Sequence, residues 1–509
     1  MELRELVTKT MSIFEVDCPE KLSSQFMNIV MGNSTNQYDN FIELVNTLDV
    51  DWLQKIFQYY YADRKIKCQD YTPKCLAQFV SYLAKSENET TVYDMCAGSG
   101  ALTIQKWSTN HNLQFVCDEF DERVIPFLLF NLAIRNINAI VRHCDVLSGE
   151  VFKCYKVVSG EKYSEVVEIS TDFIVKTDTC ISNPPYNIKW EQPCLAQLQP
   201  RFAKSNLPPA NNANFAFVLT ALENAEKSAL ILPNGVLNPN NASETAITKY
   251  LVDNNLIESI IINADKMFEA TAIGTCILVL NKNKLTTKTL FVDMRQCFKE
   301  EVREQNGQFG GKSHTNRTYT KTVKIYEDEE MKKVAKCSAT CKNIEKNMCL
   351  VMTEKIKQNK YALNPSKYID YVEEENIHRN YTDIVKDLNH IRKRKNACKL
   401  TINETLARQI GLAVNVLKTD INSDADECTQ FVEKLSGIKV IKNNYIAFSK
   451  NKGEIKFENG SKDMLSEILI MLLQSWKQNV IIMNNEENMY LSELRDALLP
   501  DLMSGKIEI

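Results

Sequence analysis

Residues 90–107 read TTVYDMCAGSGALTIQKW and give the first indication of the fold class. The β-rich start predicts a buried strand, Gly98 and Gly100 predict a tight turn, and the apolar spacing after residue 100 predicts a helix. Glycines at such a corner let the backbone approach a ligand, and a helix N-terminus favours a carboxylate or phosphate. Ala101-Leu102-Thr103 supplies no third glycine, so the turn departs from the dinucleotide pattern and favours a different nucleoside cofactor.

From about residue 70 to 295, short β-rich runs alternate with helical stretches, a pattern typical of an α/β protein with a parallel sheet. Seven segments are predicted to form buried strands: 90–98, 113–120, 139–147, 178–186, 227–237, 256–264 and 274–282. A further segment, 157–170, is predicted to form a β-hairpin. The fold class we expect is a doubly wound, mostly parallel Rossmann-like sheet, with an N-terminal helical domain and an α+β C-terminal region. The predicted divisions are 1–68 (helical), 69–300 (sheet domain), 301–400 (connecting) and 401–509 (C-terminal).

Acidic residues end three of the predicted strands. Asp94 closes the first strand, and Asp118, Glu119 and Asp121 compete at the end of the second, where register favours Glu119. A carboxylate in this position binds ribose hydroxyls in folds of this type. Asp145 ends the third strand and is placed to accept a hydrogen bond from an adenine amino group.

Asn183-Pro184-Pro185-Tyr186 follows the next predicted strand directly. The two prolines fix φ and remove two backbone donors, so the Asn183 side-chain oxygen and the Pro184 carbonyl become two acceptors for one exocyclic amine. Tyr186 offers a flat surface for an unstacked base, which is how enzymes grip a base taken out of a duplex. By itself the tetrapeptide predicts only that a flat amine or amide is held.

The overall composition sets broad limits. A net charge of −4 argues against a protein that coats nucleic acid uniformly, although a local basic channel would suffice for DNA binding. The 16 cysteines are scattered and are expected to be reduced thiols, and we predict no metal site. No apolar run spans a membrane and no secretory signal is recognised, so a cytoplasmic location without membrane association is expected. The basic run 391–399 fits either a solvated helix face or a phosphate contact.

With these motifs in place, the chain resembles the N6-adenine DNA methyltransferases, and among them the modification subunits of type I restriction-modification systems. The resemblance covers roughly residues 69–300 and a patch at 361–370. The further segments that carry it are Gln69–Pro73, Arg201–Phe202, Leu207–Pro209, Asn212–Phe217, Leu232–Leu237, Met267–Phe268, Gly274–Ile277 and Tyr361–Tyr368. The chain departs from the family at Met95, Cys96 and Ala101, and at Asn214, where Asp is typical.

The resemblance implies site-specific transfer of a methyl group from S-adenosylmethionine to adenine N6 in DNA. It implies that Asn183, Pro184 and Tyr186 are catalytic and that Tyr186 and Phe268 stack on the base. The implied cofactor-binding residues are Tyr71, Thr72, Pro73, Asp94, Ala97, Gly98, Gly100, Glu119 and Asp145. The implied partners are double-stranded DNA with a flipped adenine, a specificity subunit and a restriction subunit.

Residues 490–507 resemble the C-terminal end of a type I specificity subunit. Residues 401–509 are therefore expected to form either a partial recognition module or a subunit interface. Two other functions stay open at this stage: methylation of a protein glutamine amide, and a non-catalytic assembly role. Methylation of cytosine N4 is a third, which Asn rather than Ser before the prolines disfavours.

Overall fold

The computed structural model describes residues 3–32, 35–61, 72–268, 273–306, 318–342, 344–369, 379–380, 382–395, 479 and 482–498. The chain divides into two compact units, residues 1–371 and 372–509.

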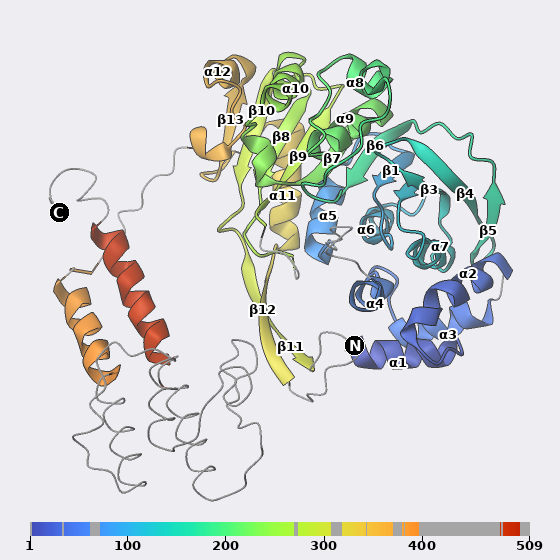
Figure 1. Cartoon of the computed structure of the whole chain (residues 1–509), viewed down its shortest axis with the longest axis horizontal. Helices are drawn as coiled ribbons and strands as arrows, with labels where there is room; N and C mark the ends of the chain where they lie inside the picture. Colours follow the sequence, from blue (N-terminus) through green and yellow to red (C-terminus); the bar gives the residue numbers. More distant parts are fainter. Residues whose placement is uncertain are drawn as a thin grey trace, which may run out of the picture. The chain divides into compact units, whose positions relative to one another are not determined.

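A sheet of eleven strands forms the centre of the first unit, in the order β13-β10-β8-β9-β7-β6-β1-β2-β3-β4-β5 (Figure 1). Its strands are β1 (Thr91–Met95), β2 (Gln114–Glu119), β3 (Asn138–Asp145), β4 (Glu150–Ser159), β5 (Ser164–Ile169), β6 (Thr177–Ser182), β7 (Ala225–Pro233), β8 (Ile257–Ile262), β9 (Thr275–Asn281), β10 (Lys288–Asp293) and β13 (Met348–Met352). A separate antiparallel hairpin consists of β11 (Lys299–Asn306) and β12 (Thr318–Ile325). The seven predicted strands are confirmed, as is the hairpin, whose first strand begins earlier than expected.

The sheet is mostly parallel, as predicted. Eight of its eleven strands share one direction, and β4, β9 and β13 run in the opposite direction. From β1, the chain adds β2 and β3 on one side and β6 and β7 on the other. The strand order therefore reverses at β1. In open α/β sheets, ligands bind at the carboxyl ends of the strands where this reversal occurs.

Helices cover both faces of the sheet. They are α1 (Leu3–Ile13), α2 (Leu22–Gly32), α3 (Asn36–Val45), α4 (Trp52–Tyr60), α5 (Lys74–Leu83), α6 (Ala101–Thr109), α7 (Ile125–Ala133), α8 (Pro200–Ala203), α9 (Asn214–Asn224), α10 (Ala242–Asp253), α11 (Asp328–Thr340) and α12 (Thr353–Gln358). Alternate strand residues point to opposite faces, so Val92 and Ile261 join the core under α1–α7 and α11. Their neighbours Tyr93 and Ile260 join the core under α8–α10 and α12.

The predicted N-terminal helical region packs on the sheet domain through aromatic rings. Phe130 of α7 lies 4.8 Å from Phe26, 5.3 Å from Phe14 and 5.3 Å from Phe41, measured between ring centroids. Aromatic pairs at these separations add to the stabilisation that burial alone gives. Helices α1–α4 are thus part of the same core as α7, with no boundary of packing between them.

The observed division of the chain differs from the boundaries predicted at residues 68, 300 and 400. Beyond residue 300, β13 pairs with β10 and extends the main sheet. The Asn-Pro-Ser segment forms the short 3-10 helix η4 (Pro365–Lys367), and its Tyr368 ring lies 4.5 Å from that of Phe291 on β10. Both elements therefore belong to the sheet unit and not to a connecting region.

In the second unit, helices 382–395 and 482–498 pair in antiparallel fashion. Ile384, Leu388 and Ile391 are buried at the spacing of a helical seam. Arg392 and Lys395 of the predicted basic run form ion pairs with Glu487, and Arg394 with Glu486. The sequence also predicts a hairpin near residues 440–458 and an amphipathic helix at about 462–480, and both lie outside the described residues, apart from residue 479.

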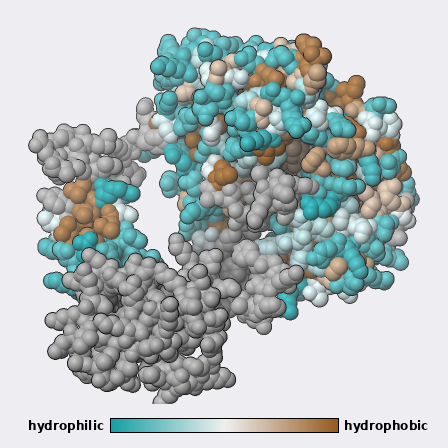
Figure 2. All heavy atoms as spheres, in the orientation of Figure 1, coloured by the Kyte–Doolittle hydropathy of each residue, from teal (hydrophilic) through white to brown (hydrophobic). Residues whose placement is uncertain are grey.

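On the face shown in Figure 2, hydrophilic residues dominate the surface of the described part of the chain, and apolar side chains form small separate groups. Among the described residues, no helix has both the length and the apolar character needed to cross a membrane. Within the same residues, no three His, Cys, Asp or Glu side chains are grouped so that they could bind a metal ion.

Gly100, the N-cap of α6, requires the absence of a side chain. Its φ of +98° lies in the left-handed region, and an added Cβ would stand 2.9 Å from Leu128 Cδ1. Gly149 has φ of +84° with nothing within 4 Å of such a Cβ. Gly100→Ala should therefore lower the free energy of unfolding by about 2–4 kcal/mol, against about 1 kcal/mol for the control Gly149→Ala, in denaturant titrations. Equal losses would contradict the crowding at Leu128.

Candidate active site

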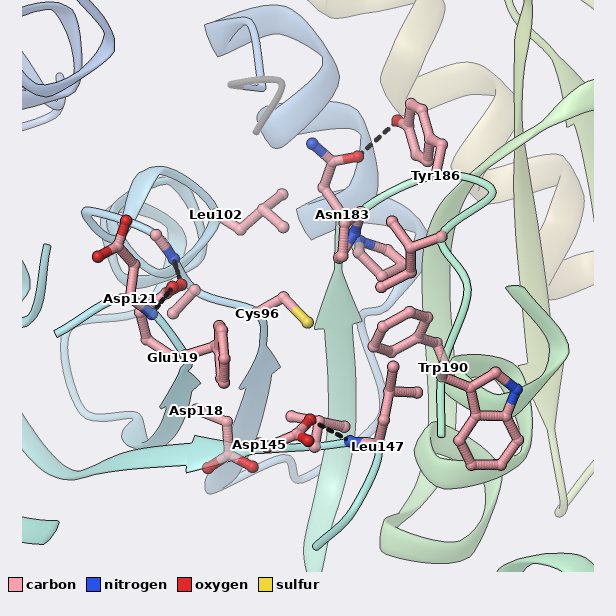
Figure 3. A pocket seen from close by; sticks show the side chains of 18 of the residues that line it. Cys96, Leu102, Asp118, Glu119, Asp121, Asp145, Leu147, Asn183, Tyr186 and Trp190 are labelled. Carbon is pink, nitrogen blue, oxygen red and sulfur yellow. Dashed lines mark hydrogen bonds between the residues drawn. The ribbon is translucent and has the colours of Figure 1, made fainter. Parts of the chain in front are cut away.

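The pairing of β1 with β6 brings the two predicted motifs together. Met95 stands opposite Ser182 in the parallel register, and Ser182 Oγ donates to the Met95 carbonyl. The glycine loop leaves β1 one residue later, and Asn183 leaves β6 at the same level. Figure 3 shows Cys96 and Asn183 side by side at the ends of these neighbouring strands.

The glycine loop is held to the end of β2. Cys96, Gly98 and Gly100 all have positive φ, which turns the backbone sharply into α6. Gly98 N donates to Glu119 Oε2 at 2.7 Å, and the other Glu119 oxygen accepts from Asp121 N at 2.8 Å. These bonds fix the Glu119 carboxyl against the loop, as the close-up shows (Figure 3). Burial raises the pKa of Glu119.

The other two acids at the end of β2 pair with arginines. Arg142 binds Asp118 at 2.5 Å, and Arg123 binds Asp121 at 2.7 Å. An arginine partner ties up carboxylate oxygens in charge-assisted hydrogen bonds. Glu119, which register favoured in the sequence, is thus the acid whose oxygens bind backbone amides of the loop and of residue 121.

Asp94 lies behind the loop and not on a cavity wall. Its side chain is fully buried, and Oδ2 accepts from both the backbone and the hydroxyl of Thr103 in α6. Oδ1 has no hydrogen-bond partner. Desolvation raises the pKa of Asp94 to about 7. The residue anchors α6 beneath the glycine turn.

This raised pKa has a consequence for stability. The fold favours the protonated form of Asp94, so between about pH 4 and 7 the folded state binds more protons than the unfolded chain, and the free energy of unfolding falls as pH rises. Asp94→Asn removes this titration, and its stability should decline less steeply over that interval in denaturant titrations. The surface variant Asp172→Asn should keep the wild-type slope. An unchanged slope in Asp94→Asn would exclude the raised pKa.

A cavity of about 640 Å³ opens at the strand ends. Its wall combines the glycine loop, the acids at the ends of β2 and β3, and the tetrapeptide. Asp145 lies on this wall and accepts from Leu147 N at 2.9 Å (Figure 3). The size is within the range of small-molecule and cofactor sites, and the mixture of apolar walls with a few directed polar groups is typical of them.

The tetrapeptide forms one side of the cavity. Asn183 Nδ2 donates to Thr72 Oγ1 at 2.9 Å, and the Tyr186 hydroxyl donates to Asn183 Oδ1 at 2.5 Å (Figure 3). The Tyr186 ring is buried and meets Phe268 edge-on, with 6.2 Å between the ring centroids. The Asn183 amide is therefore oriented from both ends, and its oxygen points toward the tyrosine hydroxyl.

The hydrogen bonds of Asn214 account for an asparagine at a position where the family typically has Asp. Its Oδ1 accepts from Asn187 N at 3.0 Å, and its Nδ2 donates to Asn187 Oδ1 at 2.9 Å. Asn187 has a φ of +54° immediately after the tetrapeptide. An amide can both donate and accept, so this reciprocal pair holds the turn without a charge.

The structure brings together most of the predicted site residues. Those on the cavity wall are Thr72, Ala97, Gly98, Glu119, Asp145, Asn183, Pro184 and Tyr186. Four others lie near the site but off this wall: Pro73 as N-cap of α5, Asp94 and Gly100 behind the loop, and Phe268 behind Tyr186. Tyr71 lies outside the described residues.

Several residues of the cavity wall were not predicted as site residues from the sequence. They are chiefly Gln54, Phe120, Leu147, Trp190 and Phe217. Phe120 is 54% exposed. Its position directly after the strand-end acid Glu119 could have indicated a residue of the cavity wall. Gln54 belongs to the N-terminal helices, far from the motifs in sequence, and carried no signal.

The strand reversal at β1, the glycine loop and the Asn-Pro-Pro-Tyr turn define the Rossmann-like methyltransferase class. The chain belongs to the N-6 DNA methylase family, whose model matches residues 49–377. A type I restriction-modification methyltransferase subunit from Streptococcus thermophilus has a similar fold, with a TM-score of 0.51, 21% identity, and coverage of 72% of this chain and 80% of that one.

Two relatives illustrate the similarity in sequence. The HindI type I methylase subunit of Haemophilus influenzae is 26% identical over 381 residues, which cover 71% of this chain and 78% of the relative. The MjaVIII type I methylase subunit of Methanocaldococcus jannaschii is 24% identical over 327 residues, or 62% of this chain. This chain spans about half of the latter subunit, with 52% of its length covered.

Proposed function

We propose that this protein is a site-specific DNA methyltransferase that transfers a methyl group from S-adenosylmethionine to N6 of adenine. The observation that carries the proposal is the placement of the Asn183 amide on the wall of the glycine-loop cavity, in a chain of the N-6 DNA methylase family. We further propose that it acts as the modification subunit of a type I restriction-modification system. Its relatives bear the names of such subunits.

The cavity suits S-adenosylmethionine in its chemistry. The Glu119 carboxylate lies on the cavity wall and accepts backbone amides, and its two oxygens together offer about four acceptor positions, which leaves capacity for a ribose hydroxyl. Asp145 offers a second carboxylate to an amino group, and Phe120 a flat apolar wall. When bound, the cofactor supplies a methyl group on a positively charged sulfur.

The tetrapeptide would hold the target amine. Asn183 Oδ1 and the Pro184 carbonyl are acceptors for the two N6 hydrogens, and they bind more strongly as the nitrogen becomes tetrahedral and its N–H bonds become more acidic. Holding the amine also aligns its lone pair with the methyl group before reaction. The Tyr186 hydroxyl donates to Asn183 Oδ1 in this structure, and an amide oxygen has two lone pairs, so the entering amine either shares this oxygen with the hydroxyl or displaces it.

Asn183→Ala should abolish methylation and leave cofactor binding within about twofold, because it removes the amine acceptor and no group that the cofactor needs. Incorporation of labelled methyl into DNA, with the specificity partner present, measures the first effect and calorimetry the second. The control Asn254→Ala, whose side chain caps a surface helix, should behave as wild type. Normal turnover in Asn183→Ala would overturn the assignment.

Two substitutions of Tyr186 distinguish the contribution of ring stacking from that of the hydroxyl's hydrogen bond. Tyr186→Phe keeps the flat ring and removes the hydroxyl that competes for Asn183 Oδ1, so methylation should persist with an equal or lower KM for DNA. Tyr186→Ala removes the stacking surface and should lower kcat/KM about tenfold to a hundredfold, since stacking of a base on an aromatic ring is worth about 1–3 kcal/mol. Equal activity of the Ala and Phe variants would exclude a stacking role.

Two observations weigh against the alternatives. The family match favours DNA over a protein glutamine amide as the substrate, and the ordered tetrapeptide favours turnover over a purely assembling role. In the second unit, the basic side chains Arg392, Arg394 and Lys395 pair with glutamates of the same chain, which favours a solvated helix face over phosphate contact. Modification-sensitive sequencing of DNA from cells with and without the gene would identify the base and its sequence.

A further inference from the structure

We propose that Asp51, at the start of α4 in the N-terminal helical region, is a positioning residue for the glycine loop. This role rests on the proposed function, because it assumes that the glycine loop binds S-adenosylmethionine. Under it, the affinity for the cofactor depends on a residue that precedes the cofactor motifs in sequence. The residue touches neither the reacting atoms nor the cavity, and it acts through Ser99.

Asp51 is the centre of a buried hydrogen-bond network. Ser99 Oγ donates to Asp51 Oδ2 at 2.6 Å, and Asn131 Nδ2 donates to Asp51 Oδ1 at 2.9 Å. Asn131 Nδ2 also donates to the Ser99 carbonyl at 2.8 Å. Both the side chain and the backbone of Ser99 are thus held from one side, and Asp51 is only 7% exposed.

The loop needs such support because of its composition. Ser99 lies between Gly98 and Gly100, both of which have positive φ. Glycine has more conformations to lose than any other residue, so ordering this turn costs more than ordering an ordinary one. A bond from Ser99 to a fixed carboxylate reduces the number of conformations open to the loop before the cofactor arrives. Such pre-organisation raises affinity without a new ligand contact.

Asp51 is itself fixed on the sheet unit by Arg135. The guanidinium donates to the Leu48 and Val50 carbonyls at 2.7 and 2.8 Å, and to the Asn131 side chain at 2.9 Å. Arg135 is also the nearby positive charge that compensates the buried Asp51 carboxylate. The segment before α4 is therefore docked firmly enough to hold a glycine loop in place.

The first turn of α4 also reaches the tetrapeptide. As N-cap, Asp51 accepts from Gln54 N at 3.0 Å. The Gln54 side chain lies on the cavity wall and donates to the Thr72 carbonyl at 3.1 Å, while the Thr72 hydroxyl accepts from Asn183. One helix end thus supports the glycine loop directly and the Asn183 amide through Thr72.

The test compares Ser99→Ala, Asp51→Asn and the double variant with Asp49→Asn. Asp49 lies two residues away, and its half-exposed carboxylate pairs with Lys74 at the surface. Ser99→Ala and Asp51→Asn should each weaken S-adenosylmethionine binding about tenfold in calorimetry, as expected for loss of a hydrogen bond to a charged group. The KM for the cofactor should rise in step while kcat changes much less, and the double variant should lose little more than Asp51→Asn alone. Asp49→Asn should bind as wild type does.

A second readout needs no cofactor. Hydrogen exchange of the amides in residues 96–103 should be faster in Ser99→Ala and Asp51→Asn than in wild type or Asp49→Asn, because the loop opens more often. Wild-type exchange and affinity in folded Ser99→Ala would overturn the role of Asp51, as would additive losses in the double variant. Should Asp51→Asn fail to fold, Ser99→Ala decides alone. Faster exchange in a protein whose wild type binds no cofactor would support the positioning role and reject the proposed function.

Discussion

The site depends on one structural constraint, the parallel pairing of β1 with β6 that places Met95 opposite Ser182. Strands next to each other in a sheet are about 4.8 Å apart, so two motifs more than eighty residues apart in sequence leave the sheet as neighbours. One motif is a glycine turn whose backbone can approach a cofactor, and the other is a proline-rigid turn with acceptors for an amine. A change of register would move the two apart.

Around this pair, the fold supplies supports of different kinds. Below the glycine turn, Asp94 anchors α6 through Thr103. On the β2 side, Glu119 binds the loop backbone, and on the N-terminal side Asp51 binds Ser99. Three carboxyl groups thus hold one short loop, and burial raises the pKa of each. Their cost in desolvation is offset by the donors that the loop and its neighbours provide.

The N-terminal helices share the core of the sheet domain and contribute residues to the surroundings of the cavity. They share an aromatic core with α7, and α4 contributes both Asp51 and Gln54 to the surroundings of the cavity. The family model likewise begins at residue 49 and extends to residue 377. The matched range thus begins before the Thr-Pro motif at residues 72 and 73 and ends after the Asn-Pro-Ser segment.

The sequence alone was sufficient to predict the α/β class, the seven central strands, and the grouping of Gly98, Glu119, Asp145 and Asn183 at strand ends, because these features follow from local periodicity and turn chemistry. It did not reveal Gln54, the support by Asp51 or the addition of β13 to the sheet. These depend on contacts between residues far apart in the chain, which leave no local pattern. Only the tertiary structure shows that Arg142 pairs with Asp118 and Arg123 with Asp121, while the Glu119 oxygens accept backbone amides, because these contacts depend on how the chain packs.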